Sequence, residues 1–269
     1  MRDNRPQTLG EKVIWLKDHY RNPLMPILAD KYAARQYIAE KGAERYLVPL
    51  LGVYDSVREI DVDKLPDQFI LKCNHGYACN IMVKDKSKLD WEGAKRQLEK
   101  WMASDFSKVH GEWWYGEIPR KIVCEELLQN ENGQLIHDHK IFMMNGSPKY
   151  IHIIVRRGKA ETTHTFFWLH GEQILVQRAK YSWETEIDIS RASSWLLWDE
   201  MVEIATQIVP EEIPLVRLDF LVCNNRIYTG EFTFMPSAGK FYYTPEEYNT
   251  IFGDMLELPG LEQRKGGAS

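Results

Sequence analysis

Cysteine is scarce in this chain, and its spacing argues against two common kinds of site. Four cysteines occur in 269 residues, and no two of them form a Cys-x-x-Cys pair. The sequence therefore does not indicate a zinc knuckle or a thioredoxin-like redox motif. Cys73, Cys124 and Cys223 lie within apolar runs, where cysteine behaves as a small hydrophobic residue. We expect reduced thiols in the core of a cytosolic protein.

The chain also lacks a long apolar segment and an excess of positive charge. Its first six residues, Met-Arg-Asp-Asn-Arg-Pro, contain no apolar signal-peptide core. No apolar run approaches the ~20 residues needed to cross a bilayer. The formal net charge is -5 and the pI about 5.9, so the basic surface typical of nucleic-acid binding is not expected. These features predict a cytoplasmic protein with no integral membrane segment and no nucleic-acid partner.

What is present is an ordinary globular composition, with 44% hydrophobic and 27% charged residues. Helical periodicity predicts helices at 9–20, 30–42, 90–101 and 192–208, with a last helix starting near Pro245. Strand patterns occur at 69–73, 80–83, 121–128, 136–144, 148–156, 161–169, 172–178, 215–223 and 226–233. Hairpins beside a few helices indicate an α+β fold rather than a doubly wound parallel sheet.

Two acidic residues, Asp219 and Glu231, lie in the last two predicted strands, on either side of the tight turn at 224–225. Pairing of these strands would bring the two carboxylates close together. Side chains two positions apart share a strand face, so Arg217 lies beside Asp219, and Thr233 beside Glu231. Mg²⁺ would relieve the repulsion between the carboxylates, with phosphate oxygens as further ligands. The alternative is a structural ion pair in which Arg217 neutralises one carboxylate.

Five segments in chain order resemble the ATP-grasp fold. They are Asp30-Lys31, the strand 69–72 with Asn74-His75-Gly76, the strand 123–128, the segment 138–142, and Arg217-x-Asp219 with Glu231-x-Thr233. The stretches 20–37 and 230–234 narrow the resemblance to the TupA-like branch, which is tied to teichuronopeptide synthesis and to bacterial surface-polysaccharide gene clusters. The resemblance covers roughly residues 9–250. Each motif alone is weakly specific for this fold, whereas five motifs in this order are fairly specific.

The resemblance implies an α+β fold of two lobes, whose mostly antiparallel sheets clasp ATP. It implies an N-terminal helix and lead-in over residues 1–28, a smaller lobe with the phosphate loop over 29–125, a larger lobe with the metal and ribose side over 126–259, and a mobile tail over 260–269. Members of this fold usually begin with a further domain that helps to bind the substrate. Only about thirty residues precede Lys31, so we expect that domain to be largely missing.

The resemblance also implies ATP and Mg²⁺ as cofactors, with contacts from each matching segment. Lysine ammonium groups would hold the phosphates, and the loop would approach them through its backbone. The implied nucleotide contacts are Lys31, Lys72, His75, Gly76, Glu125, Glu126, Leu127, Leu128, Asp138 and Lys140. Among them, Glu125 would face the adenine amino group, and the backbone from Leu127 to Leu128 would contact the edge of the adenine ring.

At the metal end, the resemblance implies Asp219, Glu231 and Thr233 as ligands, with Thr233 replacing the usual asparagine. Arg217 would stabilise the reacting group and would act with Lys31 and Lys72 in catalysis. An anionic substrate would meet Arg156 and Arg157.

The implied reaction is an ATP-dependent carboxylate–amine ligation through an acylphosphate. The expected substrate is a uronic acid of a bacterial capsule, O-antigen or teichuronopeptide precursor, joined to an amino acid or amine. A sugar phosphotransferase, a glycosyltransferase and a non-catalytic nucleotide-binding subunit stay open as alternatives, as does a homodimer. The expected partners are therefore a small-molecule or saccharide carboxylate and an amine.

Two further clusters have weaker signals. His137 and His139 share a strand face and could bind zinc, but no third ligand is evident nearby. The run Trp113-Trp114-Tyr115 could stack on a sugar ring, although packing is the favoured interpretation.

Overall fold

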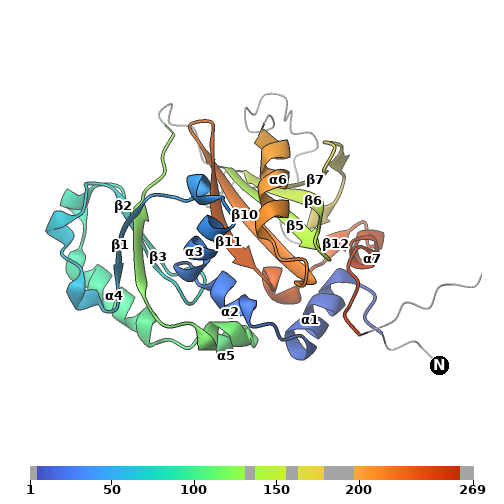
Figure 1. The fold of residues 1–269 in the computed structure, drawn as a ribbon, viewed down its shortest axis with the longest axis horizontal. Helices are drawn as coiled ribbons and strands as arrows, with labels where there is room; N and C mark the ends of the chain where they lie inside the picture. Colours follow the sequence, from blue (N-terminus) through green and yellow to red (C-terminus); the bar gives the residue numbers. More distant parts are fainter. Residues whose placement is uncertain (1–4, 131–136, 156–162, 179–196, 261–269) are drawn as a thin grey trace, which may run out of the picture.

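The structure is a computed structural model that describes residues 5–130, 137–155, 163–178 and 197–260. Its strands form a four-stranded sheet in the order β1-β4-β2-β3 and a six-stranded sheet in the order β11-β10-β5-β6-β7-β8. Figure 1 shows the smaller sheet on the left and the larger sheet on the right. Neighbouring strands pair antiparallel in both sheets. The α+β class and the antiparallel sheets that the sequence predicts are therefore confirmed.

The smaller sheet contains β1 (Leu50–Tyr54), β2 (Phe69–Cys73), β3 (Asn80–Val83) and β4 (Ile122–Glu126). The larger sheet contains β5 (His137–Met144), β6 (Ser147–Val155), β7 (Thr163–Trp168), β8 (Gln173–Ile174), β10 (Leu215–Cys223) and β11 (Arg226–Thr233). A separate pair joins β9 (Gln177–Arg178) to β12 (Tyr243–Thr244).

The helices are α1 (Leu9–His19), α2 (Leu24–Ala29), α3 (Ala33–Glu40), α4 (Trp91–Ala103), α5 (Ser107–His110), α6 (Trp198–Ile208) and α7 (Glu247–Asp254). Short 3₁₀ turns include η5 (Trp113–Glu117) and η8 (Pro236–Gly239). Within the described ranges, no helix combines the length and the apolar character that a membrane span requires.

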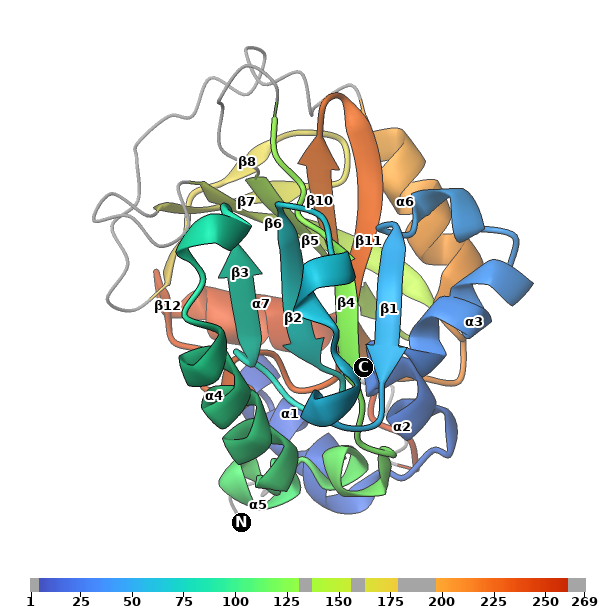
Figure 2. The ribbon, with the colours of Figure 1, turned by 90° about the vertical axis from the view of Figure 1, so that its left-hand side faces the viewer.

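The smaller sheet has one apolar face and one charged face, because successive strand residues point to opposite sides. Phe69, Leu71 and Cys73 of β2 are buried in a core that α4 closes with Leu98. Lys72 lies between these positions in the chain and therefore points the other way. Figure 2 shows this sheet in front, with β10 and β11 behind it. The face that carries Lys72 is thus turned toward the larger sheet.

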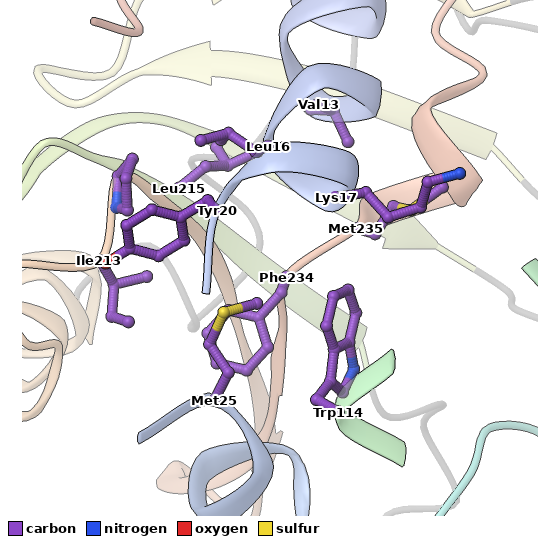
Figure 3. A pocket seen from close by; sticks show the side chains of 11 residues that line it. Val13, Leu16, Lys17, Tyr20, Met25, Trp114, Ile213, Leu215, Phe234 and Met235 are labelled. Carbon is purple, nitrogen blue, oxygen red and sulfur yellow. The ribbon is translucent and has the colours of Figure 1, made fainter. Parts of the chain in front are cut away.

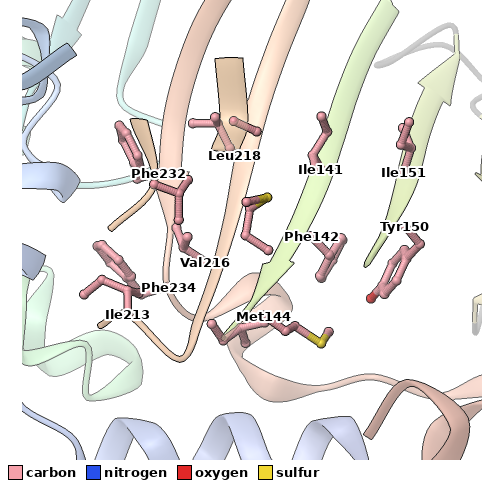
Figure 4. Close-up of a cluster of buried hydrophobic side chains, with 14 of the residues drawn as sticks. Ile141, Phe142, Met144, Tyr150, Ile151, Ile213, Val216, Leu218, Phe232 and Phe234 are labelled. Carbon is pink, nitrogen blue, oxygen red and sulfur yellow. The ribbon is translucent and has the colours of Figure 1, made fainter. Parts of the chain in front are cut away.

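The larger sheet is covered on both faces. On one face, Phe167 packs against Trp198 of α6, with ring centroids 5.2 Å apart. On the other, Tyr150 stacks between Phe142 and Phe252 of α7, at 4.5 Å from each. The buried apolar side chains of β5, β6, β10 and β11 are drawn in Figure 4. Burial of apolar surface on both faces stabilises this sheet.

Helix α1 packs against the larger lobe. Thr8 and Glu11 form a capping box at its start, and Leu9, Val13 and Leu16 enter the larger core. Lys12 Nζ donates 2.8 Å hydrogen bonds to the carbonyls of Gly253 and Leu256. These contacts hold the N-terminal helix beside α7. The division of the chain at residues 28, 125 and 259 stays a prediction.

Most predicted elements are observed, and the differences occur around prolines and polar caps. The predicted helix from Asp30 begins at Ala33, because the Asp30 carboxylate accepts a hydrogen bond from the Tyr32 N–H at 2.7 Å and closes a turn. Pro23 stands at the N-cap of α2, where a missing N–H is harmless. Residues 104–120, for which the periodicity predicts no helix or strand, contain α5 and η5. The last helix begins at Glu247 rather than at Pro245.

Candidate active site

Lys31 connects three parts of the chain. It follows α2, and its ammonium group donates a hydrogen bond to the carbonyl of Gly76 in the loop after β2. The same nitrogen lies 3.7 Å from Glu231 Oε2 in β11. Its backbone N–H donates to the Asn74 carbonyl at 3.3 Å. The structure thus brings together Lys31, the predicted phosphate loop and one predicted metal ligand.

The loop after β2 is anchored by side chains that point into the protein. Asn74 donates to Asp30 Oδ1 and to the Pro119 carbonyl, both at 2.8 Å. The buried His75 ring contacts Asn74 Oδ1 at 3.3 Å and the Trp101 carbonyl at 3.2 Å, and burial lowers its pKa. A phosphate contact from His75 would therefore have to come from its backbone. The ring itself anchors the loop.

Packing, as well as the predicted phosphate binding, favours a glycine at Gly76. A Cβ at this position would lie 2.6 Å from Cδ2 of Phe106. Any larger residue would displace the Phe106 ring, which packs against the rings of His75 and Tyr77 with centroids 5.6 Å away in each case. Glycine therefore lets the loop lie directly on the segment around α5.

On the charged face of the smaller sheet, Glu125 accepts hydrogen bonds from two cations. Lys72 Nζ lies 2.6 Å from Glu125 Oε2, and Arg35 donates through NH1 to Oε1 at 2.7 Å. Arg35 also donates to the Val48 carbonyl at 2.7 Å. The sequence analysis missed Arg35, which lies one helical turn after Lys31 and had only that spacing as a signal. Contact of Glu125 with adenine stays a prediction.

Asp219 is held by two buried cations. Arg217 donates from Nε to Oδ1 at 2.6 Å and from NH2 to Oδ2 at 2.8 Å, and Lys140 of β5 donates to Oδ2. Burial raises the pKa of Asp219, but the charges of Arg217 and Lys140 outweigh it, so this pKa lies below the ordinary value. Burial lowers the pKa of Lys140. The structure therefore contains the Arg217 ion pair that the sequence left open as an alternative, and Asp219 must exchange a cation to bind Mg²⁺.

A β-bulge places Asp219 opposite two residues of β11. Leu218 pairs with Phe232 and Phe220 with Thr229, so the register shifts by one residue at Asp219. A Cβ on Gly230 would lie 3.0 Å from the Asp219 carbonyl, so the bulge favours glycine there. Bulges re-aim side chains. Glu231, in the bulged part of β11, lies beside Lys31, with 41% of its side chain exposed.

Thr233 lies in the same cluster as Arg217. Its hydroxyl accepts a 3.1 Å hydrogen bond from Arg217 NH2. Asp138 is buried on β5, and its negative charge acts on both Arg217 and Lys140. The predicted metal end of the site is thus a compact cluster of acidic and basic groups on one sheet face.

Glu112 is a buried acid that the sequence analysis did not select. It is 5% exposed and precedes η5. Burial raises its pKa to about 7, the charge of Glu231 adds to this shift, and Lys17 opposes it. A lone glutamate in the run Gly-Glu-Trp-Trp-Tyr was the available signal, since isolated carboxylates rarely lie among aromatics.

The other predicted residues are less informative. Glu126 is exposed at the end of β4, and Leu127 and Leu128 are half-buried just after it. Arg156 and Arg157 lie outside the described residues, as does the side chain of His137.

The zinc hypothesis at His137 and His139 stays a prediction, because the side chain of His137 lies outside the described residues. Over the ranges that the structure describes, no group of three or more His, Cys, Asp or Glu side chains is arranged to hold a metal. The packing interpretation of the tryptophan run holds for Trp114, whose buried ring meets Phe234 edge-on with centroids 5.7 Å apart.

The hollow between α1 and β10 is a packing gap. Figure 3 shows it lined by Val13, Leu16, Trp114, Phe234 and their neighbours. Its volume is about 10 Å³, which is room for at most one water. A wider groove of about 630 Å³ lies between β3 and the start of α4. Neither hollow is lined by a predicted ATP-binding residue.

Comparison with known proteins identifies a family. The family model described as TupA-like ATPgrasp matches residues 11–257. No curated protein matches the chain.

Several solved structures are similar to part of this chain. The D-alanine–D-alanine ligase from Bacillus anthracis in complex with ATP is 14% identical, with a TM-score of 0.42 over 77% of this chain and 54% of that one. N5-carboxyaminoimidazole synthase from Aspergillus clavatus is 10% identical, with a TM-score of 0.42 over 77% and 44%. The ATP-grasp ligase PsnB with a minimal precursor is 11% identical, with a TM-score of 0.45 over 87% and 62%. The chain spans about half the length of the first two.

Proposed function

Because the chain belongs to the TupA-like ATP-grasp family, we propose that it is an ATP-dependent carboxylate–amine ligase. The observation that carries the proposal is the position of Lys31, whose ammonium group joins the Gly76 loop to Glu231. A cation between a glycine loop and a carboxylate suits the triphosphate end of Mg-ATP, where the loop and lysine face phosphate oxygens and the carboxylate faces the metal.

The chemistry requires activation of the carboxylate. A free carboxylate does not react with an amine at neutral pH, because oxide is a very poor leaving group. Transfer of the γ-phosphoryl group from ATP to a carboxylate oxygen gives an acylphosphate and ADP. The amine nitrogen then attacks the acyl carbon, the C–N bond forms, and the C–O bond to phosphate breaks with release of inorganic phosphate. Positioning and electrostatic stabilisation supply most of the catalysis in this type of reaction.

We assign roles to the residues that the fold brings together. Lys31 and Lys72 would orient the phosphates, each leaving its present carboxylate partner, Glu231 or Glu125, when phosphate oxygens replace it. Arg217 would stabilise the negative charge that develops on the reacting carboxyl oxygen. Lys140 would keep Asp219 ionised and would move toward phosphate when Asp219 turns to the metal.

Asp219, Glu231 and Thr233 supply three oxygen donors, which suit Mg²⁺ better than a softer ion. Bound Mg²⁺ would neutralise the charge on the phosphates during transfer. Two carboxylates and one hydroxyl leave several coordination positions for phosphate oxygens and water, as is usual for Mg²⁺ in nucleotide enzymes.

The proposed substrate is a uronic acid of a capsule, O-antigen or teichuronopeptide precursor, and the second substrate is an amino acid or amine. The support is the TupA-like family match over residues 11–257. Arg156 and Arg157 would bind the anionic acceptor.

The test is ADP release from Mg-ATP across panels of uronic acids and amines, with the wild-type chain and E231Q. Glu231 is chosen because it is half-exposed and makes no buried ion pair, so its loss should spare the fold. D67N, at an exposed loop position, is the control for carboxylate removal. We expect ADP release that needs both a uronate and an amine, and its loss in E231Q alone. ADP release with a neutral sugar and no amine would favour a phosphotransferase instead.

A further inference from the structure

The Glu112 side chain is buried without a partner. It is 5% exposed and makes no hydrogen bond or ion pair with any residue in the described ranges. Lys17 is the cation whose charge reaches it, yet Lys17 forms its ion pair with Asp18, at 3.4 Å. A buried carboxylate with no counter-ion is unfavourable when it is ionised, so the group either keeps its proton or gains a ligand that supplies positive charge.

The neighbours of Glu112 come from the site described above and from an aromatic cluster. The charge of Glu231 acts on Glu112, and Glu231 is the carboxylate beside Lys31. The charge of Glu112 in turn acts on the hydroxyls of Tyr77 and Tyr115, whose ring centroids are 6.3 Å apart. Glu112 is therefore within electrostatic reach of Glu231, and it lies next to the aromatic pair in the chain, since the Tyr115 N–H donates to the Glu112 carbonyl at 3.1 Å.

We propose that Glu112 and the rings of Tyr77 and Tyr115 form the subsite for the ammonium group of the amine substrate. This inference rests on the proposed ligase function, which requires an amine substrate. In that reaction the amine must approach an acyl carbon next to the γ-phosphate. The carboxylate would accept hydrogen bonds from the ammonium group and would take one of its protons before the neutral nitrogen attacks the acyl carbon, and the two aromatic rings would attract the cation. The negative charge of Glu231 would also attract the ammonium group, without contacting it.

An ammonium group fits this position better than a second metal ion. Mg²⁺ takes about six oxygen ligands, which one carboxylate with aromatic neighbours does not supply. Aromatic rings offer Mg²⁺ no ligand, whereas they stabilise an alkylammonium ion. A single buried carboxylate with aromatic neighbours in the chain therefore suits an ammonium ion better than a metal.

The experiment is a titration of the full chain with ethylammonium chloride, with ethanol as the neutral control. The indole N–H resonances of Trp113 and Trp114, the two residues after Glu112, report binding by NMR. The variant is E112Q, which keeps the shape of the side chain and removes its charge. E117Q is the matched control, because Glu117 is an exposed acid on the same segment.

We expect saturable binding of ethylammonium to the wild type and to E117Q, and binding about tenfold or more weaker in E112Q. Equal binding by E112Q would overturn the proposal. So would an absence of saturable binding to the wild type, or displacement of ethylammonium by Mg²⁺ added alone at the same resonances. Thermal unfolding of each variant verifies that it is folded before its titration is compared.

A second arm separates this inference from the ligase proposal. In the ADP-release assay, E112Q should raise KM for the amine about tenfold or more while leaving KM for ATP unchanged. If the wild type releases no ADP with any uronate and amine, the ligase proposal fails, and the ethylammonium titration still decides whether Glu112 binds a cation. If ADP release is normal and KM for the amine is unchanged in E112Q, the subsite assignment alone is wrong.

Discussion

Lys31 Nζ lies 3.7 Å from Glu231 Oε2, although one residue follows the second helix and the other lies in the last strand of the larger sheet. The same ammonium group donates to the Gly76 carbonyl. This contact is the place where the N-terminal segment, the loop of the smaller sheet and the predicted metal end meet. Both partners are partly exposed, with 16% and 41% of their side chains accessible, so a ligand can replace either contact.

Lys31→Met should abolish most ATP turnover without unfolding the chain. The variant removes a cation that we place on the phosphates, and loss of one such group costs about 100-fold or more in rate. The measurement is kcat for ADP release, together with ATP affinity. K100M, at an exposed position of α4, is the control and should behave as the wild type. Wild-type turnover in K31M would remove Lys31 from the site.

Asp219→Asn should destabilise the fold as well as impair catalysis. Removal of the Asp219 charge leaves Arg217 and Lys140 buried without their common counter-ion. Breaking a buried ion pair from one side costs about 3 kcal/mol or more in the free energy of unfolding. Urea unfolding of D219N against D67N measures this cost.

The cost should also depend on pH. Since the folded pKa of Asp219 is depressed, its contribution is fully present above the unfolded pKa of 3.8 and is lost as pH falls through the lower folded value. The difference in unfolding free energy between D219N and the wild type should therefore be largest near neutral pH and shrink in acid. An equal difference at every pH would contradict the ion-pair explanation.

Glu112→Gln should stabilise the ligand-free protein at alkaline pH. The pKa of Glu112 rises from 4.5 to about 7 on folding, so the folded state retains a proton that the unfolded state has lost between these values. Wild-type stability therefore falls relative to E112Q as pH rises from 4.5 to about 7, and the gap stays constant above that. At about 1.4 kcal/mol per pKa unit, the gap reaches roughly 3 kcal/mol.

Unfolding free energies of E112Q and the wild type at acidic and alkaline pH check this prediction, with E117Q as the control. The two curves should meet in acid, below the unfolded pKa of 4.5. A gap that is the same at acidic and alkaline pH would show that burial does not act on the charge of Glu112.

Gly76→Ala should strain the loop after β2. The new Cβ would meet Phe106 Cδ2 at 2.6 Å, and overpacking of this kind costs about 1–3 kcal/mol. Phe106→Ala should relieve the clash, so the double variant should be more stable than the sum of the single effects predicts. Thermal unfolding of the wild type, both single variants and the double variant completes the cycle. Additive effects would mean that the ring does not cause the strain.

The sequence predicted the hairpin that carries Asp219 and Glu231, because strand alternation and the 224–225 turn are local signals. It did not predict the bulge at Asp219, which depends on how Gly230 packs against the opposite backbone. It did not predict that Lys140 binds Asp219, because that contact requires β5 to pair with β10 in one register. A change of one residue in this register would turn Lys140 to the other face.

Arg35 and Glu112 were missed for a related reason. Their local signals, the spacing of Arg35 from Lys31 and the aromatic neighbours of Glu112, are weak, and their importance comes from burial next to residues far along the chain. His75 is the converse case. Its place in a motif suggested a phosphate contact, but the tertiary structure turns its ring toward Trp101.

By itself, then, the sequence determined the α+β class, the antiparallel hairpins and the family, because periodicity, turn residues and motif order are written along the chain. The tertiary structure decided which charges meet: Lys31 with Glu231, Lys72 and Arg35 with Glu125, and Lys140 with Asp219. The physical reason is that ion pairing and burial depend on distance in space. That distance is set by the register and packing of two sheets whose strands are far apart in the sequence.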